Sequence, residues 1–150
     1  MNKTKIYLAC PWARKDLAAE GKLTLEAAGF VVTSRWITDH ADKPADQSGL
    51  DFDATMLKTE AMHDVEDIYN CDIMVLLNTQ KRGEETSGKA VETGIAMAWL
   101  KPVIVVGERT NVFHYLDMPL LETIEEAIST IKGWEARESL IVQPSGIIPV

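Results

Sequence analysis

Apolar and polar positions along the chain fall into blocks that predict strands and helices in alternation. Short, nearly continuous apolar runs, typical of strands buried on both faces, occupy residues 6–9, 30–34, 72–77 and 102–106. A further short strand is expected near 115–121. Apolar residues at helical spacing occupy the segments 14–28, 54–69, 88–100 and 121–131. This alternation predicts one doubly wound α/β domain, with a five-stranded parallel sheet and helices on both faces.

Such a sheet binds its ligands outside the carboxyl ends of the strands. The loops expected at that end begin near Cys10, Arg35, Asn78 and Gly107. Candidate chemistry is therefore sought in these loops and in the helix starts that follow them. The segment 133–150 has no clear pattern, but its apolar end, 147–150, is expected to contact a neighbouring copy of the chain.

Composition and charge narrow the classes of partner. The chain has 150 residues, the size of one domain, and a formal net charge of −8. It carries no basic stripe, so neither a nucleic-acid polymer nor a membrane surface is an expected partner, although a small phosphate needs only a local site. Cys10 and Cys71 form no Cys-x-x-Cys motif, and His63 and His114 lack metal-ligand spacing, so no metal or cofactor is expected. Without a visible signal peptide or membrane-spanning run, the expected location is the cytoplasm.

Glu92 is the first candidate for chemistry. It lies in the segment 87–94, which opens a helix after a buried strand and a polar loop, and it shares a helical stripe with Ile95 and Trp99. A carboxylate thus interrupts an apolar face near the expected ligand crevice. The positive end of the helix dipole is expected to keep Glu92 ionised, as a nucleophile requires. The alternative is that Glu92 is one of the acids that are common near helix starts.

Asp64 interrupts the apolar stripe of the preceding helix in the same way, since Leu57, Ala61 and Ile68 share its face. A half-buried carboxyl group has a raised pKa and can donate a proton. The alternative is a rim position that is hydrogen-bonded to a loop. Two carboxyl groups around one glycosidic bond are the usual arrangement for retaining cleavage, so Asp64 and Glu92 together indicate more than either alone.

Other residues at the expected crevice suit binding. Trp12 follows Pro11 in the first loop, where an aromatic ring can stack on a planar base or pack in the interior. The free N–H groups at the start of the helix predicted at 88–100 can hold an anion, and glycine there allows the backbone to approach a ligand closely. The candidates for a phosphate site are Arg14, Thr86, Ser87, Gly88 and Lys89. Tyr7 lies in the first strand, where an aromatic side chain is usually part of the core.

Three features of the sequence carry a resemblance to a known family: the first strand at 6–9, Asp64 eight residues before Asp72, and the segment 87–94. Together they resemble the nucleoside 2-deoxyribosyltransferase family, which includes 2′-deoxynucleoside 5′-phosphate N-hydrolases. The resemblance covers about residues 5–107. It implies that Glu92 is the nucleophile that forms a covalent deoxyribosyl–enzyme intermediate. It also implies that Asp64 assists protonation of the leaving base, that Tyr7 orients the nucleophile, and that Trp12 contacts the base.

The same resemblance bears on the substrate. Six residues before Glu92, the transferases tend to carry an Asp that binds the sugar 5′-hydroxyl, and the hydrolases a Ser that binds phosphate. This chain has Thr86 followed by Ser87, and a hydroxyl favours a deoxynucleoside 5′-monophosphate because an Asp would repel phosphate. The first loop departs from the hydrolases, since Pro11 replaces a phosphate-binding Ser. Transferases complete their site with a neighbouring subunit's C-terminus, so a homo-oligomer, a dimer or larger, is expected.

The sequence therefore predicts an enzyme, in which residues 1–150 form one nucleoside 2-deoxyribosyltransferase-like domain. It would cleave the N-glycosidic bond of a (deoxy)nucleoside or its 5′-monophosphate, with water or a second base completing the reaction. The expected partner is this small molecule, and no cofactor is expected. A non-catalytic nucleotide-binding module on the same fold is the alternative. The flavodoxin-like fold would also permit flavin binding, but the first loop, 10–14, lacks the Ser, Thr and Gly residues of a flavin-phosphate loop.

Overall fold

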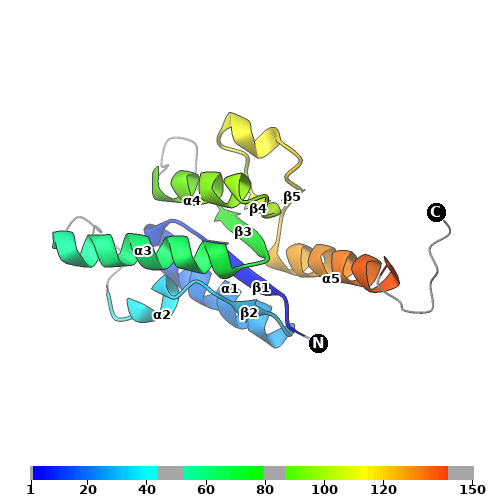
Figure 1. The fold of residues 1–150 in the computed structure, drawn as a ribbon, viewed down its shortest axis with the longest axis horizontal. Coiled ribbons are helices and arrows are strands. Elements are labelled where there is room, and N and C mark those ends of the chain that lie inside the picture. Colours follow the sequence, from blue (N-terminus) through cyan, green and yellow to red (C-terminus); the bar gives the residue numbers. More distant parts are fainter. Residues whose placement is uncertain (1, 44–52, 80–86, 142–150) are drawn as a thin grey trace.

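A sheet of five parallel strands in the order β2-β1-β3-β4-β5 runs through the centre of the molecule (Figure 1). The computed structural model describes residues 2–43, 53–79 and 87–141. The strands are β1 Lys5–Ala9, β2 Val31–Val32, β3 Ile73–Asn78, β4 Val103–Gly107 and β5 Leu120–Leu121. The predicted five-stranded, doubly wound sheet is thereby confirmed.

Helices cover both faces of this sheet. They are η1 Trp12–Arg14, α1 Lys15–Ala27, α2 Trp36–Asp39, α3 Ala54–Asn70, α4 Ser87–Ala98, η3 Val112–Tyr115 and α5 Ile124–Ile141. Successive side chains of a strand point to opposite faces. Ile6 and Leu8 of β1 therefore pack into the core with α1 and α5, whereas Tyr7 and Ala9 pack on the other side with α3 and α4. Tyr7 thus faces the two helices that carry Asp64 and Glu92.

The sequence predicted the end of the first helix well. Gly29 follows α1 with a φ of +100°, the left-handed conformation that glycine adopts without strain. The N–H of Phe30 donates to the carbonyl of Leu25 at 3.2 Å, as in a Schellman motif. The chain therefore turns sharply into β2.

The last helix is longer than predicted. It was expected to end at residue 131, but α5 continues to Ile141 through Gly133. Trp134, directly after this glycine, packs against the core cluster that contains Ile131, so tertiary packing carries the helix past a residue of low helix propensity. Neither α5 nor any other helix in the described ranges has the length and apolar character needed to cross a lipid bilayer.

The outer surface of α4 is more apolar than predicted. The helical spacing of apolar residues over 88–100 predicts that Val91, Ala98 and Trp99 face inward, but all three are exposed, with Val91 at 62% and Trp99 at 41%. The helix meets the sheet through a narrower stripe that includes Thr93 and the fully buried Ala96. The larger apolar residues Val91 and Trp99 therefore lie on the outer side of the helix.

The order of the strands places the expected crevice between β1 and β3. The chain adds β2 on one side of β1 and β3 on the other, so the carboxyl ends of β1 and β3 form the topological switch point at which doubly wound folds bind ligands. Asn78 ends β3 directly opposite Gly107 of β4. Gly107 has a φ of +113°, and a Cβ there would lie 2.4 Å from the Asn78 carbonyl oxygen, so only glycine fits.

Candidate active site

Tyr7 and Glu92 are joined by a hydrogen bond on the side of the sheet that α3 and α4 cover. The Tyr7 side chain is fully buried, and its hydroxyl donates to Glu92 Oε1 at 3.1 Å. Burial, and after it the negative charge of Glu92, raises the pKa of Tyr7 well above its ordinary value. The hydroxyl therefore keeps its proton and remains a donor. Tyr7 is thus a core residue that also contacts the candidate nucleophile.

Glu92 lies half-buried in the second turn of α4. Burial, followed by the negative charge of Asp64, raises the pKa of Glu92 to about 8, and the hydrogen bond from Tyr7 acts in the opposite direction. The structure therefore differs from the expectation that the helix start keeps Glu92 ionised. The helix dipole acts mainly within the first turn, and beyond it the loss of solvent dominates.

Asp64 lies half-buried on α3. Burial, followed by the negative charge of Glu60, raises the pKa of Asp64 to about 6, as expected for a half-buried acid that interrupts an apolar stripe. Asp64 Oδ1 is a buried atom without a hydrogen-bond partner among the described residues. An ionised carboxyl group in such surroundings is costly, which favours its protonated form.

Tyr7, Asp64 and Glu92 meet in one place although they come from three separate elements. The Asp64 charge acts on Glu92, and the Tyr7 hydroxyl lowers the pKa of both carboxyl groups. Two neighbouring carboxyl groups resist ionising together, so near neutral pH the pair holds about one proton. Such a pair offers one carboxylate, which can attack an electrophilic carbon, and one carboxylic acid, which can donate a proton.

Two cations, Arg14 and Lys89, lie near the carboxyl end of β1. Their charges lower the pKa of the Cys10 thiol, although burial is the larger effect and raises that pKa to about 12. The charge of Glu92 also acts on this thiol, in the opposite direction. Cys10 keeps its proton and is itself a poor nucleophile.

The side chain of Lys89 is more buried than expected for a lysine that binds phosphate. It is 6% exposed, and its ammonium group donates to Asn78 Oδ1 at 2.5 Å. The Asn78 amide donates in turn to the Glu108 carbonyl oxygen at 2.5 Å and to Thr110 Oγ1 at 2.9 Å. This network holds the ammonium group at the carboxyl ends of β3 and β4, where its positive charge has a fixed position.

Trp12 belongs to an aromatic group at the first loop. Its ring centroid lies 6.2 Å from that of Trp36 and 6.2 Å from that of His40. His40 contacts Glu60, one helical turn before Asp64, so the group borders α3 on the amino-terminal side of Asp64. Contact between Trp12 and a base stays a prediction.

The predicted phosphate-binding helix start is described only in part. Thr86 lies outside the described residues, and of Ser87 the backbone alone is described. Gly88 is exposed, and a Cβ added there would meet no other atom within 4 Å. The role of these three residues stays a prediction.

Sequence reasoning missed Glu60, Asp67 and Asn78. The first two share a face of α3 with Asp64, at the helical spacing i, i+4 and i+7, and this spacing is visible in the sequence. Asn78 interrupts the end of an otherwise apolar strand, which is also a readable signal. Both patterns were open to interpretation as ordinary surface or loop residues.

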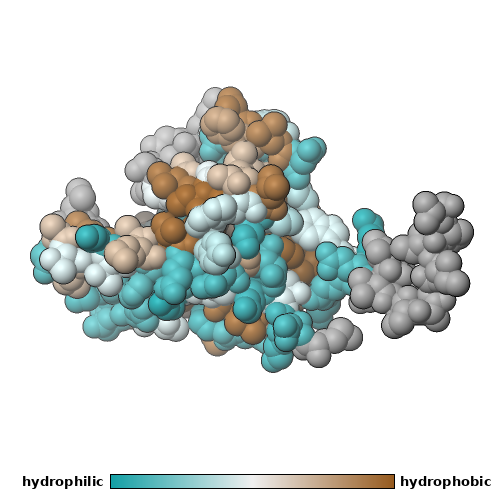
Figure 2. Space-filling view, in the orientation of Figure 1, coloured by the Kyte–Doolittle hydropathy of each residue, from teal (hydrophilic) through white to brown (hydrophobic). Residues whose placement is uncertain are grey.

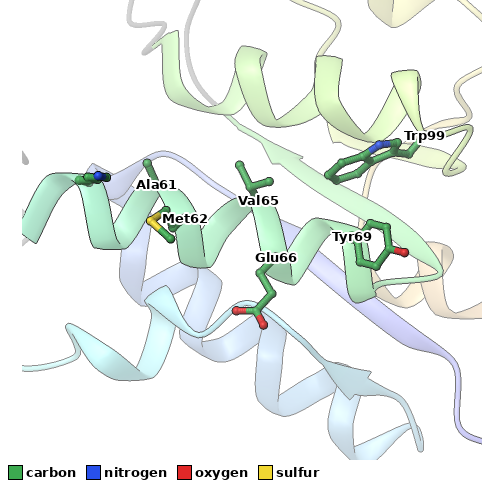
Figure 3. A pocket seen from close by; sticks show the side chains of 7 residues that line it. Ala61, Met62, Val65, Glu66, Tyr69 and Trp99 are labelled. Atoms are coloured by element: carbon green, nitrogen blue, oxygen red, sulfur yellow. The ribbon is translucent and has the colours of Figure 1, made fainter.

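A hollow of about 510 Å³ lies away from these groups, on the outer side of α3 and α4. It is lined by Lys58, Ala61, Met62, Val65, Glu66, Tyr69 and Trp99. Figure 3 shows Val65 and Tyr69 of α3 beside Trp99, with Glu66 pointing away. None of Tyr7, Asp64 or Glu92 lines this hollow, so it is a surface feature separate from the candidate active site.

Comparison with known proteins gives one family and several related folds. The family profile described as nucleoside 2-deoxyribosyltransferase matches residues 6–138. No curated protein matches the chain. A 2-deoxyribosyltransferase from Bacillus psychrosaccharolyticus superposes with a TM-score of 0.65 at 20% identity, over 83% of this chain and 90% of that one.

Two further solved structures share the fold. A conserved protein from Enterococcus faecalis V583 has a TM-score of 0.63 at 16% identity, over 89% of this chain and 99% of that one. The CMP N-glycosidase of Clostridium botulinum has a TM-score of 0.53 at 17% identity, over 86% of this chain and 99% of that one. At such identities the superpositions establish the shared architecture.

Proposed function

The chain belongs to the nucleoside 2-deoxyribosyltransferase family, and from this premise we propose that it cleaves the N-glycosidic bond of a deoxynucleoside 5′-monophosphate through a covalent intermediate on Glu92. The observation that carries the proposal is the hydrogen bond from the Tyr7 hydroxyl to Glu92, with Asp64 close enough for its charge to act on the same carboxyl group. The pair supplies the nucleophile and the acid that glycosidic cleavage with retention requires.

In the first half of the reaction, a Glu92 oxygen attacks the anomeric carbon as the bond to the base breaks. The electron pair of that bond goes to the base nitrogen, and the proton of Asp64 is transferred to the departing base. Tyr7 donates to Glu92 Oε1 and leaves Oε2 as the attacking atom. The hydroxyl also fixes the direction of the carboxyl plane, which lowers the entropy cost of reaching the reactive geometry.

In the second half, a water molecule attacks the same carbon and releases the Glu92 carboxylate, while the water proton returns to Asp64. If the nitrogen of a second base attacks instead, the result is base transfer, and that nitrogen gives its proton to Asp64. Incubation with a panel of deoxynucleosides and their 5′-monophosphates, with and without a second base, distinguishes the two outcomes by chromatography. Release of no base from any of them would contradict the proposed function.

The proposed preference for a phosphorylated substrate is supported by two cations near the carboxyl ends of β1 and β3: Arg14 lies in η1, and the Lys89 ammonium group is held by Asn78 Oδ1. Hydrogen bonds to a charged group are about twice as strong as neutral ones. One neighbour with the shared fold is a CMP N-glycosidase, whose substrate is a nucleoside monophosphate. The free thiols Cys10 and Cys71 fit the reducing cytoplasm, which we propose as the location of the protein.

We expect kcat/KM for a deoxynucleoside 5′-monophosphate to exceed that for the unphosphorylated nucleoside by about tenfold or more. The replacement Thr86→Asp should remove this preference, because its carboxylate repels phosphate, and Thr86→Ser is the matched control that keeps the hydroxyl. For the wild type and both variants, the ratio of the two kcat/KM values is measured from base release under initial-rate conditions. Wild-type preference for the free nucleoside, or an unchanged ratio in Thr86→Asp, would contradict the proposed phosphate site.

We also propose a homo-oligomer, at least a dimer. The apolar tail that first suggested it, 147–150, lies outside the described residues. Independent support comes from the outer surface of α3 and α4, where Met62, Tyr69 and Trp99 are 61%, 63% and 41% exposed. Figure 2 shows hydrophobic residues gathered where these two helices lie side by side. A soluble monomer rarely exposes a large contiguous apolar patch, and a second copy of the chain would cover it.

Sedimentation or light scattering at micromolar concentration should accordingly give at least twice the mass of one chain. The variant Trp99→Glu places a charge in the middle of the apolar surface and should lower the measured mass to that of a monomer. Leu23→Glu is the control, because Leu23 is 68% exposed on α1, which covers the opposite face of the sheet. A monomeric wild type would show that the surface serves another purpose.

A further inference from the structure

Three side chains contact the ring of Trp12 at the carboxyl end of β1. Trp12 begins η1, a single turn, and its side chain is half-buried. The Trp36 ring centroid lies 6.2 Å from that of Trp12 at an interplanar angle of 51°, and the His40 ring centroid lies 6.2 Å from it at 67°, an edge-to-face arrangement. Lys15 Nζ lies 5.5 Å from the centre of the same indole ring.

All three contacts depend on the short helix α2. Trp36 is the first residue of α2, and His40 directly follows its last residue. Lys15 belongs to α1, but its Nζ donates to the carbonyl oxygen of Ala41, just beyond α2, at 3.0 Å. The orientation of the Trp12 ring is therefore set by α2 and its flanking residues, which follow it in the chain by more than twenty positions.

The start of α2 is firmly anchored. The Arg35 backbone N–H donates to Asp67 Oδ2 at 2.9 Å, and Arg35 Nε donates to Asp67 Oδ1 at 2.8 Å. The Trp36 Nε1–H donates to the carbonyl oxygen of Leu8 at 3.2 Å, and the side chain of Ile37 is buried in the core. α2 is thus joined to both α3 and β1, and it can serve as a fixed support for the ring of Trp12.

The end of α2 is joined to α3 through His40. His40 Nε2 lies 2.7 Å from Glu60 Oε2, and the two side chains are only 12% and 24% exposed. Glu60 lies on α3 one helical turn before Asp64. A carboxylate at this distance fixes the direction in which the imidazole ring points, and the same ring contacts Trp12. His40 therefore links the Trp12 ring to the helix that carries the candidate acid.

We propose that His40 is a positioning residue for recognition of the base: paired with Glu60, it holds the Trp12 ring in the orientation in which the base contacts it. The inference rests on the proposed function, in which the base of the nucleotide meets Trp12. The location agrees with this role, because Trp36 also packs against the core cluster that contains Tyr7. A ring that is already held in place loses little freedom when a base stacks on it, so more of the contact energy becomes affinity.

The proposal separates the base from the rest of the ligand. In the proposed reaction the sugar meets Glu92, whereas only the base meets Trp12. Loss of the His40 contact should therefore weaken the binding of a nucleotide and leave unchanged the binding of 2-deoxyribose 5-phosphate, which has no base. In kinetics it should raise KM and leave kcat unchanged, as expected when uniform binding is lost. A general loss of structure would weaken both ligands.

The test measures dissociation constants by calorimetry in a Glu92→Gln background, where no turnover is expected. The ligands are a deoxynucleoside 5′-monophosphate and 2-deoxyribose 5-phosphate. His40→Gln removes the aromatic ring, and His40→Phe keeps the ring but removes the contact with Glu60. Each should raise the dissociation constant of the nucleotide by about three- to tenfold and leave that of the sugar phosphate unchanged. Trp12→Ala should raise the same constant by about ten- to a hundredfold.

Two substitutions on α3 complete the test. Glu60→Gln should weaken nucleotide binding in the same direction as His40→Phe, and the double variant should be no weaker than His40→Phe, because both break one contact. Glu66→Gln is the matched control, since Glu66 also lies on α3 but contacts Arg35 at the other end of α2, and it should bind both ligands as the parent does.

Equal weakening of both ligands in the His40 variants would overturn the inference, and so would unchanged binding of the nucleotide. A loss confined to the nucleotide, in a protein whose wild type releases no base, would keep the role of His40 in binding and overturn the proposed reaction.

Discussion

Glu92→Gln should lower kcat for base release by about three to five orders of magnitude, because a neutral amide cannot attack the anomeric carbon. The substitution is close in size and still offers an oxygen to the Tyr7 hydroxyl, which donates to Glu92 Oε1 at 3.1 Å. The fold should therefore persist, and removal of a half-buried carboxyl group is not expected to lower the melting temperature. Initial rates and circular dichroism on the same sample separate chemistry from folding.

Two controls make this result specific. Glu66→Gln is the same chemical change on the exposed side of α3 and should retain full activity. Trapping of a sugar adduct on the wild-type protein, followed by peptide mass spectrometry, should place the adduct on Glu92. Near-wild-type activity of Glu92→Gln would mean that Glu92 is an acid near a helix start with no part in bond cleavage. A wild type without any turnover would instead favour the non-catalytic binding module.

Asp64→Asn should lower kcat/KM by about two to three orders of magnitude, since loss of a general acid typically costs a factor of this size. The loss should depend on the base. A leaving group that departs easily as an anion needs little protonation and should be affected least. If Asp64 is the general acid, the wild-type rate is expected to fall at high pH as Asp64 gives up its proton, and the variant should lose this fall.

The measurement is a set of pH profiles on two substrates whose bases differ in acidity. An equal loss on both substrates, with the alkaline decline retained, would show that Asp64 is structural and that another group protonates the base. Asp53→Asn is a suitable control on the same helix, because Asp53 caps α3 by accepting from the Met56 N–H at 2.9 Å and lies away from the pair. It should leave stability nearly unchanged, because Asn caps a helix about as well as Asp, and it should leave the profiles unchanged.

Much of this arrangement could be predicted from the sequence, because it depends on local periodicity. The continuous apolar run of β3 predicts a central strand, and the alternation in β1 turns Tyr7 toward the same side as Ala9. The interruption of two helical stripes predicts that Asp64 and Glu92 face the sheet. These inferences need only the spacing of residues within one element.

The features that escaped prediction depend on contacts between elements. The sequence offers no sign that Lys89 is enclosed by Asn78, since the two are joined only when β3 and α4 come together. The raised pKa of Glu92 follows from packing and from Asp64, whereas sequence reasoning considered the helix dipole alone. The exposed position of Trp99 likewise depends on which side of α4 packs on the sheet, here the side that carries Thr93 and Ala96.

The single proton shared by Asp64 and Glu92 has a consequence for the whole reaction cycle. In the proposed reaction, Glu92 loses its negative charge when it forms the ester with the sugar, and Asp64 gains one when it gives its proton to the base. The total charge of the crevice therefore stays constant from the free enzyme to the intermediate. A site with few polar partners cannot easily accept a second charge, and here no step requires it. The poor solvation that raises the pKa values of Asp64 and Glu92 thus adds little to the activation barrier for bond cleavage, because the negative charge only moves from one carboxyl group to its neighbour.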